Sequence, residues 1–375
     1  MKQERFRLSL ALALSIAVIF GFLAGVVGEL WINSFLAPDI QFKSYRDLTQ
    51  RLDDLVAERR QTLSEMLTEG DYSFLETVNK IKPVTATIYY YKKSGALLDN
   101  IYLPSEALGS GFSLTSDGWI VTTKQVVRDA KLDYAVSIDG ATYEVERVVA
   151  DILTDAVFIK IPATNLPVAE LGSKNSLNVG ATLLSVTAAD GVKRGVISNI
   201  NFVEAKNTAD LIHSSETFSR FPLLSGSFDK HDLGAPVVNL SGKIVGLMTT
   251  DAGLVLPLDY FFGVLKPAIQ DGRIYRNYLG VNYLDLTQAV NFTSNFKKGA
   301  LVLGDKSRRA VIANSPASNS GLLSGDIITK VDNVEVNENR DLTQLIQDYP
   351  VDSTVRLTFY RDGQEQTVEL RLEKF

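Results

Sequence analysis

The histidine and cysteine content of this sequence restricts the chemistry that it can perform. The chain has two histidines, His213 and His231, and no cysteine. The absence of cysteine excludes disulfides, cysteine nucleophiles and thiolate metal sites. With two histidines and no clustered carboxylates, the sequence predicts no metal site and no cofactor. Acyl transfer by a hydroxyl nucleophile would need a base that accepts its proton and a carboxylate that holds this base.

Three segments have the order of such a triad, but two of its residues are replaced. The segment HDLGAPVVN resembles the nucleophile motif GNSGGPLVN of trypsin-like proteases, and Leu233 stands in place of the serine. The segment VTTKQVV resembles the histidine motif, with Gln125 in place of the base. Only Asp155, in TDAVFIKI, is the usual residue. Leucine has no oxygen and glutamine does not titrate near neutral pH. We therefore expect an inactive site in which Asp155 accepts backbone or hydroxyl hydrogen bonds.

His231 changes a third part of the same region. It lies two residues before Leu233, where a glycine usually helps to form the oxyanion hole. A side chain there disfavours that geometry, because glycine adopts unusual φ/ψ angles most freely. His231 and Asp232 could form a new acid–base pair, but we expect a solvated loop. A relocated nucleophile at Ser225 or Ser227 would lack a histidine placed to activate it.

The N-terminus has the features of a membrane anchor. Lys2, Arg5 and Arg7 precede an uncharged run at 8–28, which is about long enough to span a bilayer as a helix. These basic residues predict a cytoplasmic N-terminus and an exported body, periplasmic or extracellular. The run is longer than that of a cleaved signal peptide, and its AGV sequence is a poor cleavage site. We expect an uncleaved single-pass signal anchor.

A charged stretch follows, from about Ser44 to Glu69, in which leucines recur at spacings near three and four. This pattern is typical of an amphipathic helix. Two interpretations stay open: a helix that lies on the globular domain or spaces it from the membrane, and a short coiled coil that supports oligomerisation. The net charge of −6 argues against nucleic acid as a partner.

The next part of the chain is predicted to be all-β. Short runs rich in Val, Ile, Thr and Tyr are separated by Gly, Asp and Asn turns. Many short strands without long helices between them predict a barrel or sandwich. The expected strands cover residues 84–91, 109–114, 119–122, 145–149, 156–161, 181–186, 195–200, 236–239 and 243–248.

The order of the motifs GSGF, DGWIVT, TDAV and GAPVVN, followed by GKIVG, resembles the HtrA/DegP family. Its members have a trypsin-like protease domain followed by PDZ domains. The resemblance runs from Tyr72 to the C-terminus and implies a mostly β fold, with a trypsin-like double β-barrel before an α+β PDZ domain. The polar loop at 204–221 lies where the family has regulatory loops, and its sequence indicates no mechanism. The expected parts are a cytoplasmic N-terminus at 1–7, a transmembrane signal anchor at 8–31, a helical linker at 32–71, the protease-like domain at 72–271 and the PDZ domain at 276–375.

The C-terminal part resembles one PDZ domain. RNYLGV resembles the carboxylate-binding loop that opens this domain in the family, and a groove helix is expected at 341–348. In such a domain an extended peptide joins the sheet edge, and backbone N–H groups hold its terminal carboxylate. Gly280 lets the backbone come close to the ligand. The predicted peptide-binding residues are Tyr278, Leu279, Gly280, Val281, Leu342, Leu345 and Ile346. The N–H donors would be those of Leu279, Gly280 and Val281. The side chains of Leu279, Val281, Leu345 and Ile346 would either line a pocket for the last ligand side chain or pack the domain core.

These observations predict a membrane-anchored HtrA-like pseudoprotease. The barrel domain would be an inactive scaffold. The PDZ domain would bind protein C-termini or unfolded segments, in envelope protein quality control or in the regulation of an active protease. One alternative is an active HtrA-like serine endopeptidase with a non-standard catalytic site. Another is a structural anchor whose PDZ groove is blocked. The resemblance also suggests a homo-trimer or a hetero-assembly with an active relative.

Overall fold

The chain forms two compact units, Met1–Tyr72 and Ser73–Phe375, and each is described by itself. The computed structural model describes residues 2–31, 51, 54, 69–93, 101–188, 191–290 and 296–375. The helix or coiled coil predicted between Ser44 and Glu69 lies outside these residues, apart from three isolated positions.

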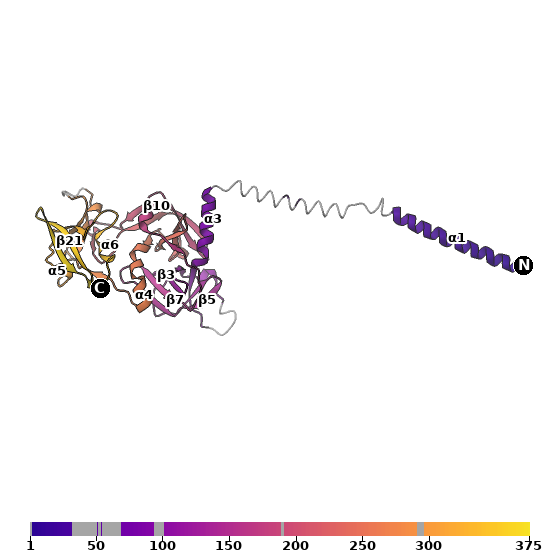
Figure 1. The fold of residues 1–375 in the computed structure, drawn as a ribbon, viewed down its shortest axis with the longest axis horizontal. Helices are drawn as coiled ribbons and strands as arrows, with labels where there is room; N and C mark the ends of the chain where they lie inside the picture. Colours follow the sequence, from indigo (N-terminus) through magenta and orange to yellow (C-terminus); the bar gives the residue numbers. More distant parts are fainter. Residues whose placement is uncertain are drawn as a thin grey trace. The chain divides into compact units, whose positions relative to one another are not determined.

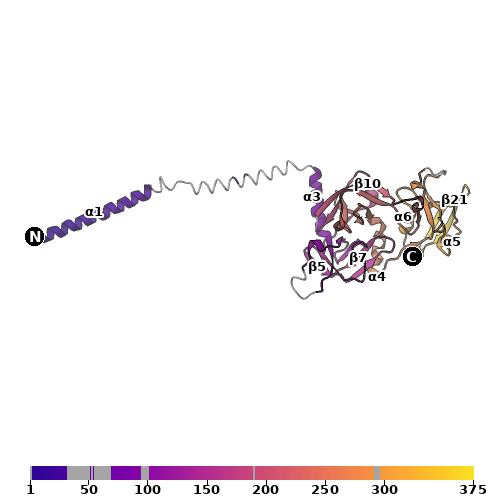
Figure 2. The same cartoon turned by 180° about the vertical axis from the view of Figure 1, so that it is seen from behind.

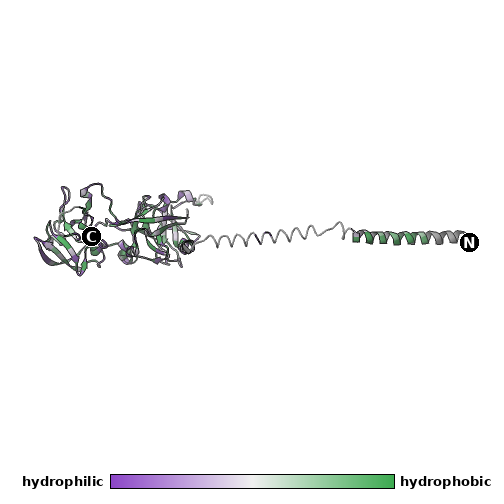
Figure 3. Ribbon diagram, turned by 90° about the horizontal axis from the view of Figure 1, so that it is seen from above, coloured by the Kyte–Doolittle hydropathy of each residue, from purple (hydrophilic) through white to green (hydrophobic). Residues whose placement is uncertain are grey.

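The first unit contains one long helix, α1 (Lys2–Trp31). Figure 3 shows that its described part is hydrophobic along its length. The segment Leu12–Trp31 has a mean hydropathy of 2.1 and is long and apolar enough to cross a membrane, a property that anchors share with signal sequences.

Helix α3 (Glu69–Ile81) leads into the second unit and packs against its core. Figure 2 shows α3 beside the barrel strands. Phe74 and Val78, four residues apart on one helix face, contact the largest buried cluster. The Thr77 hydroxyl donates to the carbonyl of Leu240 at 3.0 Å. These contacts fix the start of the protease-like domain.

The first barrel is an antiparallel sheet in the order β5-β4-β1-β2-β3-β7-β6. Figure 1 labels three of its strands, β3, β5 and β7. Asp139 and Gly140 form the β4–β5 turn with φ angles of 50° and 77°, the left-handed geometry that a two-residue hairpin turn requires. Thr123 pairs with Ala156, so the chain just after β3 lies beside the chain just before β7. The strands are β1 (Thr85–Tyr90), β2 (Gly109–Ser113), β3 (Trp119–Thr123), β4 (Tyr134–Ile138), β5 (Ala141–Glu144), β6 (Arg147–Ala150) and β7 (Ala156–Lys160).

The second barrel has the strand order β12-β10-β9-β13-β14-β15, and β8 pairs with β14. The segment that joins β10 to β12 carries a strand, β11 (Ile212–Ser214), that pairs outside this barrel. The barrel strands are β8 (Glu170–Leu171), β9 (Thr182–Thr187), β10 (Gly191–Phe202), β12 (Phe221–Ser225), β13 (Pro236–Asn239), β14 (Lys243–Met248) and β15 (Val255–Pro257).

The PDZ sheet has the order β11-β17-β18-β19-β21-β22, and β20 pairs with β19. Helix α6 (Leu342–Gln347) begins with a reciprocal cap, in which Asp341 accepts from the N–H of Gln344 and the Gln344 side chain accepts from the N–H of Asp341. The remaining elements are β16 (Asn277–Tyr278), β17 (Asn282–Asp285), β18 (Ala300–Val302), α5 (Pro316–Asn319), β19 (Ile327–Val331), β20 (Val334–Glu335), β21 (Thr354–Arg361), β22 (Gln364–Arg371) and β23 (Glu373–Lys374).

Short helices connect these elements. Helix α4 lies at Leu265–Asp271, and it ends at Gly272, whose φ of 64° is the left-handed conformation of a helix C-terminus. The 3₁₀ helices are η2 (Lys82–Val84), η4 (Pro104–Glu106), η5 (Lys174–Ser176), η6 (Thr208–Leu211), η7 (Lys230–Asp232), η8 (Leu258–Tyr260), η9 (Phe262–Val264) and η10 (Leu286–Gln288).

The buried clusters follow this division. The largest one combines side chains of both barrels, including Phe112 and Phe158 from the first and Leu184 and Leu247 from the second. A separate cluster fills the PDZ domain. The predicted fold class is confirmed: a mostly β, trypsin-like double barrel is followed by a PDZ domain, with an apolar helix at the N-terminus.

Candidate functional site

The structure places two of the predicted triad positions in contact. Gln125 lies just after β3 and Asp155 just before β7, which are paired strands. The Gln125 side-chain amide Nε2 donates to Asp155 Oδ2 at 3.2 Å. The expectation that Asp155 accepts backbone or hydroxyl hydrogen bonds is therefore wrong for this contact, because its partner is a side-chain amide. At the predicted base position, Gln125 is a neutral donor that cannot accept a proton at neutral pH.

Leu233 lies between η7 and β13, and its side chain packs partly buried against the core of the first barrel. Its carbonyl accepts a hydrogen bond from the Ser110 N–H at 2.8 Å. The next residue, Gly234, has φ of 76°, and a Cβ there would lie 2.1 Å from the Ser110 carbonyl oxygen. Only glycine allows this close approach of the two backbones. The turn at the predicted nucleophile position is thus well formed, but it carries an apolar side chain.

The backbone amides of this turn are engaged within it. Asp229 caps η7, and its Oδ1 accepts from the His231 N–H at 2.8 Å. The Asp232 N–H donates to the Asp229 carbonyl at 3.1 Å, and the Leu233 N–H donates to the Lys230 carbonyl at 3.3 Å. An oxyanion hole needs N–H groups that point at the developing charge. In this conformation the three amides already have acceptors.

Asp232 corrects the expectation of a solvated loop at 231–232. Its side chain is fully buried, and it accepts from the Ser185 hydroxyl at 2.8 Å and from Lys193 Nζ at 2.5 Å. Although burial opposes the charge of Lys193, hydrogen bonds to Asp229 and Asp232 raise the pKa of Lys193. His231 itself is partly exposed. The prediction failed at Asp232 because its cation lies 39 residues away in the sequence.

A cavity of about 280 Å³ lies beside Asp155. Six polar and five apolar side chains from both barrels line it. Gln125 and Leu233 are not among the described residues that line it. The lining residues are Lys124, Leu153, Thr154, Asp155, Glu204, Phe218, Phe221, Thr249, Thr250, Leu254 and Leu256. Among the described residues, no group of three or more histidine or carboxylate side chains could hold a metal ion.

The predicted carboxylate loop of the PDZ domain holds a carboxylate of this same chain. The N–H groups of Leu279 and Gly280 both donate to Glu216 Oε1 at 3.0 Å. The Val281 N–H donates to the Ser215 hydroxyl at 3.1 Å. Gly280 has φ of 82°, and a Cβ there would lie 2.3 Å from a side-chain carbon of the neighbouring turn.

The apolar residues predicted to line a ligand pocket belong to the PDZ core. Each is at most 2% exposed, and all are members of one buried cluster. Of the two predicted roles, lining a ligand pocket and packing the domain core, these contacts correspond to core packing. The ring of Tyr278 is partly buried and lies 5.8 Å from that of Phe375. The core residues are the four predicted pocket residues Leu279, Val281, Leu345 and Ile346, together with Leu342, which was also predicted to bind peptide.

The segment that occupies this loop was not predicted from the sequence. Residues 204–221 were expected to be a polar loop, but they contain η6 and β11 and reach the PDZ domain. His213 of β11 lies opposite Tyr283 of β17, and burial lowers the pKa of His213. The one local feature that could have indicated this contact is Glu216 after two serines, and this pattern is too common to predict a binding segment.

Two buried arginines join the protease-like and PDZ domains. Arg220, which follows β11, is fully buried and forms ion pairs with Asp285 and, at 3.7 Å, with Asp341 of the PDZ domain. Arg276, at the start of the PDZ domain, forms an ion pair with Asp151 of the first barrel. Buried charges are costly unless they are paired, so both contacts disfavour separation of the domains.

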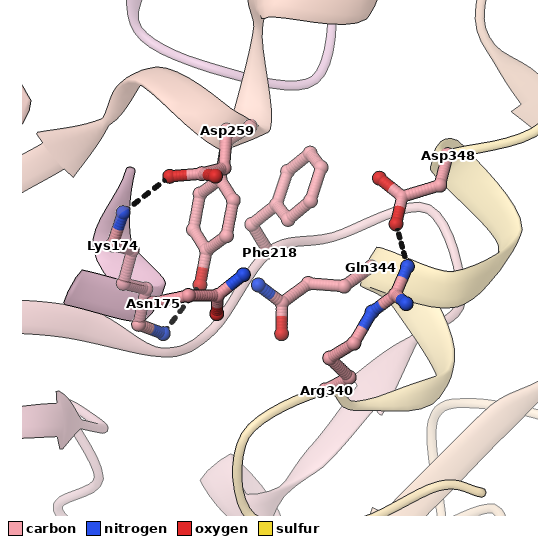
Figure 4. A pocket seen from close by; sticks show the side chains of 8 residues that line it. Lys174, Asn175, Phe218, Asp259, Arg340, Gln344 and Asp348 are labelled. Carbon is pink, nitrogen blue, oxygen red and sulfur yellow. Dashed lines mark hydrogen bonds and ion pairs between the residues drawn. The ribbon is translucent and has the colours of Figure 1, made fainter. Parts of the chain in front are cut away.

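A polar cavity of about 200 Å³ lies at the same junction (Figure 4). Lys174 and Asp259 approach from the protease-like domain, and Gln344, Arg340 and Asp348 from the groove-helix region of the PDZ domain. Arg340 and Asp348 form an ion pair, and the Lys174 N–H donates to Asp259 at 2.6 Å.

Lys174 is an unusual buried cation in this cavity. Its side chain donates to the Tyr260 hydroxyl at 3.1 Å and is 4% exposed. Burial lowers the pKa of Lys174 to about 8, and the nearby Asp341 carboxylate opposes this shift. Tyr260 is also buried, and burial raises its pKa. Burial therefore shifts both groups toward their neutral forms in the folded chain.

Comparison with known proteins agrees with this geometry. Residues 109–247 match the trypsin-like peptidase domain, and residues 278–372 match the PDZ domain. The chain is 28% identical over 338 residues to serine endoprotease DegS of Haemophilus influenzae, covering 86% of this chain and 94% of DegS. These matches support a relationship to the HtrA/DegP family. It is 27% identical over 279 residues to a DegP-like periplasmic serine endoprotease of Pseudomonas putida, covering 72% of this chain and 56% of that protein. The chain thus spans just over half the length of this DegP-like relative.

Solved HtrA structures have the same fold. The HtrA-type protease AlgW with a tripeptide has a TM-score of 0.59 and 21% identity, over 80% of this chain and 97% of AlgW. The serine endoprotease of Yersinia pestis has a TM-score of 0.51 and 22% identity, over 80% of this chain and 98% of that protein. At these identities the likeness concerns the fold.

Proposed function

We propose that this chain is a membrane-anchored pseudoprotease of the HtrA/DegP family. Its barrels are a catalytically inactive scaffold, and its PDZ domain binds protein C-termini or unfolded segments. The proposal rests above all on one contact, in which the amide of Gln125 donates to Asp155 while Leu233 fills the nucleophile position. No proton acceptor and no attacking oxygen stand at these two positions.

The turn before Leu233 supports the same conclusion. The amides of His231, Asp232 and Leu233 already donate to acceptors at 2.8, 3.1 and 3.3 Å. Removing a single oxyanion-hole donor from a serine protease slows its chemical step by about 10²–10³-fold. A tetrahedral intermediate in this cleft would meet three engaged donors, so nucleophile, base and oxyanion stabilisation are all weakened together.

The PDZ domain is the part that retains a binding activity in this proposal. Leu279 and Gly280 present two N–H groups to one carboxylate oxygen, which is the arrangement that captures a peptide carboxylate. The AlgW structures contain a tripeptide or a decapeptide. Binding of misfolded chains or of an active protease would place the protein in envelope quality control, as a homo-trimer or in a hetero-assembly with an active relative.

The location in this proposal is the cell envelope. The segment Leu12–Trp31 is apolar enough to span a bilayer, and Lys2, Arg5 and Arg7 precede it. Basic residues favour the cytoplasmic side of a membrane. The DegP-like relatives are named periplasmic proteins. The body of this chain would therefore lie on the extracytoplasmic side.

A second candidate is an active serine endopeptidase with a non-standard site, which the names of the relatives favour. It needs a hydroxyl nucleophile other than residue 233. Ser225 is exposed at the end of β12, and its hydroxyl donates to the Val196 carbonyl at 3.2 Å. That contact engages the hydroxyl proton with a backbone oxygen, and a carbonyl is not a general base.

Casein cleavage and fluorophosphonate labelling separate the two candidates. We expect neither reaction from the native full-length chain in detergent micelles. The variant Gln125→His/Leu233→Ser rebuilds the missing groups, and His231→Gly added to it tests the oxyanion turn. Turnover by the rebuilt chain would identify the barrels as a preserved scaffold. Turnover by the native chain, abolished by one substitution such as Ser225→Ala, would refute the proposal.

A further inference from the structure

The edge of the PDZ sheet is paired with a segment of the protease-like domain. Strand β17 pairs in antiparallel register with β11, with Ser214 opposite Asn282. The pairing continues at the next residue, where the Ser215 N–H donates to the Val281 carbonyl at 2.8 Å. An extended segment that joins an open sheet edge in this way is the arrangement by which PDZ domains bind peptides.

The segment also brings its own carboxylate. Glu216 is 7% exposed, and its Oε1 accepts from the N–H groups of Leu279 and Gly280 at 3.0 Å. The hydroxyls of Ser215 and Ser214 donate to its two oxygens at 2.7 and 2.5 Å. A buried carboxylate is costly unless hydrogen bonds replace its water, and four donors do so here. The Glu216 side chain therefore occupies the place of a terminal carboxylate.

The groove helix, α6, contacts the side of residues 212–217 that faces away from β17. The hydroxyl of Thr343, in α6, lies 3.4 Å from the Ser214 carbonyl oxygen and 3.3 Å from that of Thr217. At the far end, Arg308 of the PDZ domain donates to the Ile212 carbonyl at 2.7 Å. The segment is thus held by the strand, the carboxylate loop and the helix, which together form the peptide groove.

We propose that residues 212–217 are an intramolecular ligand of the PDZ groove, and that external peptides bind by displacing them. This inference rests on the proposed peptide-binding function and names its ligand class. The ligand is an extended segment that presents a carboxylate after small hydroxyl residues. Because Glu216 lies within the chain, a glutamate side chain serves as the carboxylate, and the ligand does not have to end there.

Displacement has a measurable consequence for affinity. A groove that is open for only a fraction of the time binds an external ligand with an apparent affinity reduced by that fraction. The native chain should therefore bind a matching peptide more weakly than a chain whose segment is released. A chain whose segment is locked in place should bind it more weakly still.

A disulfide offers the sharpest test. Ile212 and Leu284 are directly opposite in the β11–β17 pair, and opposite residues of antiparallel strands are close enough for a disulfide. The chain has no cysteine, so the variant Ile212→Cys/Leu284→Cys can form only this bond. The probe is a fluorescein-labelled, C-terminally amidated peptide, ADLIHSSET, whose binding to the full-length chain in micelles is followed by anisotropy. We expect the oxidised variant to bind at least tenfold more weakly than the same variant reduced.

A release variant tests the opposite direction. Glu216→Ala removes the internal carboxylate, and Glu204→Ala makes the same charge change at an exposed position between the same two barrel strands. We expect Glu216→Ala to bind the peptide at least tenfold more tightly than the native chain, and Glu204→Ala to match the native chain. If Glu216→Ala fails to fold, as judged by circular dichroism, the comparison of oxidised and reduced cysteine variants decides alone.

The outcomes separate this inference from the proposed function. Equal affinity of the oxidised and reduced cysteine variants, with clear binding by both, would overturn the intramolecular ligand and leave peptide binding intact. Absence of binding by the native, reduced and Glu216→Ala chains would overturn peptide binding, and displacement with it. Hydrogen exchange then tests the docking itself: amides 279–281 should exchange at least tenfold faster in Glu216→Ala than in the native chain, and unchanged exchange would overturn the docking as well.

Discussion

Replacing Arg220 tests whether the two domains form a single stable body. The side chain is fully buried, Nη2 pairs with Asp285, and Nε lies 3.7 Å from Asp341. Nη1 also donates to the carbonyls of Asn337 and Glu338 at 3.0 and 2.7 Å. The substitution Arg220→Met keeps a side chain of similar length but removes every hydrogen-bond donor and the charge. Removing one partner of a buried ion pair costs about 3–5 kcal/mol, because the other charge stays buried without compensation. Against a typical total of about 5–15 kcal/mol, this is a large loss.

A second substitution checks the physical reason for that loss. If the cost of Arg220→Met comes from a stranded charge, then making the partner neutral should recover part of it. The double variant Arg220→Met/Asp285→Asn keeps an oxygen that can accept from Thr287, as Asp285 does at 3.0 Å. We expect it to be more stable than Arg220→Met by at least about 1 kcal/mol. If the two substitutions instead destabilise the fold independently, the double variant will be less stable than both the native chain and Arg220→Met.

The assay is urea unfolding of the full-length chain in micelles. Far-UV circular dichroism follows both domains, and in a Trp31→Phe background the fluorescence of Trp119, which is 3% exposed, follows the first barrel. Arg356→Met is the matched control, because its pair with Glu369 is exposed and solvent screens such pairs. A midpoint for Arg220→Met equal to that of Arg356→Met would refute the reasoning.

Three further predictions concern other buried groups. Lys193→Met should lower the free energy of unfolding by about 1.5–3 kcal/mol in urea titrations, because it strands the buried Asp232. Gly280→Ala should cost about 1–3 kcal/mol in the same assay and weaken binding of the labelled peptide, since its Cβ would lie 2.3 Å from that of Ser315. Lys174 has a folded pKa of about 8 against an ordinary 10.5, so the unfolded chain binds more protons between these values. Relative to Lys174→Met, the native chain should therefore gain stability as pH rises from 8 to 10.5, by roughly 3 kcal/mol, and a flat difference would contradict the burial of this cation.

The elements that could be predicted from the sequence depend on local patterns. Alternating apolar residues and Asp-Gly turns gave the barrel hairpins, because side-chain period and turn geometry are set within a few residues. The expected strands at 109–114 and 119–122 correspond to β2 and β3, whereas β4 and β5, on either side of the Asp139–Gly140 turn, were not among the expected strands. The loop at 279–281 was recognised because its motif resembles that of a family. The catalytic inactivity, the predicted domain boundaries and the peptide-binding role stay predictions.

The features that the sequence did not reveal depend on distant partners. Glu216 meets Leu279 across 63 residues, and Lys193 meets Asp232 across 39. β11 has three residues, too few for a periodic signal, and it is a strand because the edge of β17 supplies its hydrogen bonds. No local preference of a Ser-Ser-Glu sequence distinguishes such a strand from a surface loop.

Strand β11 precedes β17 in the chain, and this order matters during synthesis. In the proposed topology the body emerges N-terminal part first on the extracytoplasmic side, and domains generally fold in that order, so the second barrel can present β11 before the PDZ sheet is complete. Without β11, β17 would be the outermost strand of its sheet, with a row of unpaired backbone groups that invites edge-to-edge aggregation. In the whole chain, β11 is available to pair with β17 as the PDZ sheet forms. A PDZ domain expressed alone from residue 276 would lose that protection and should be more prone to self-association.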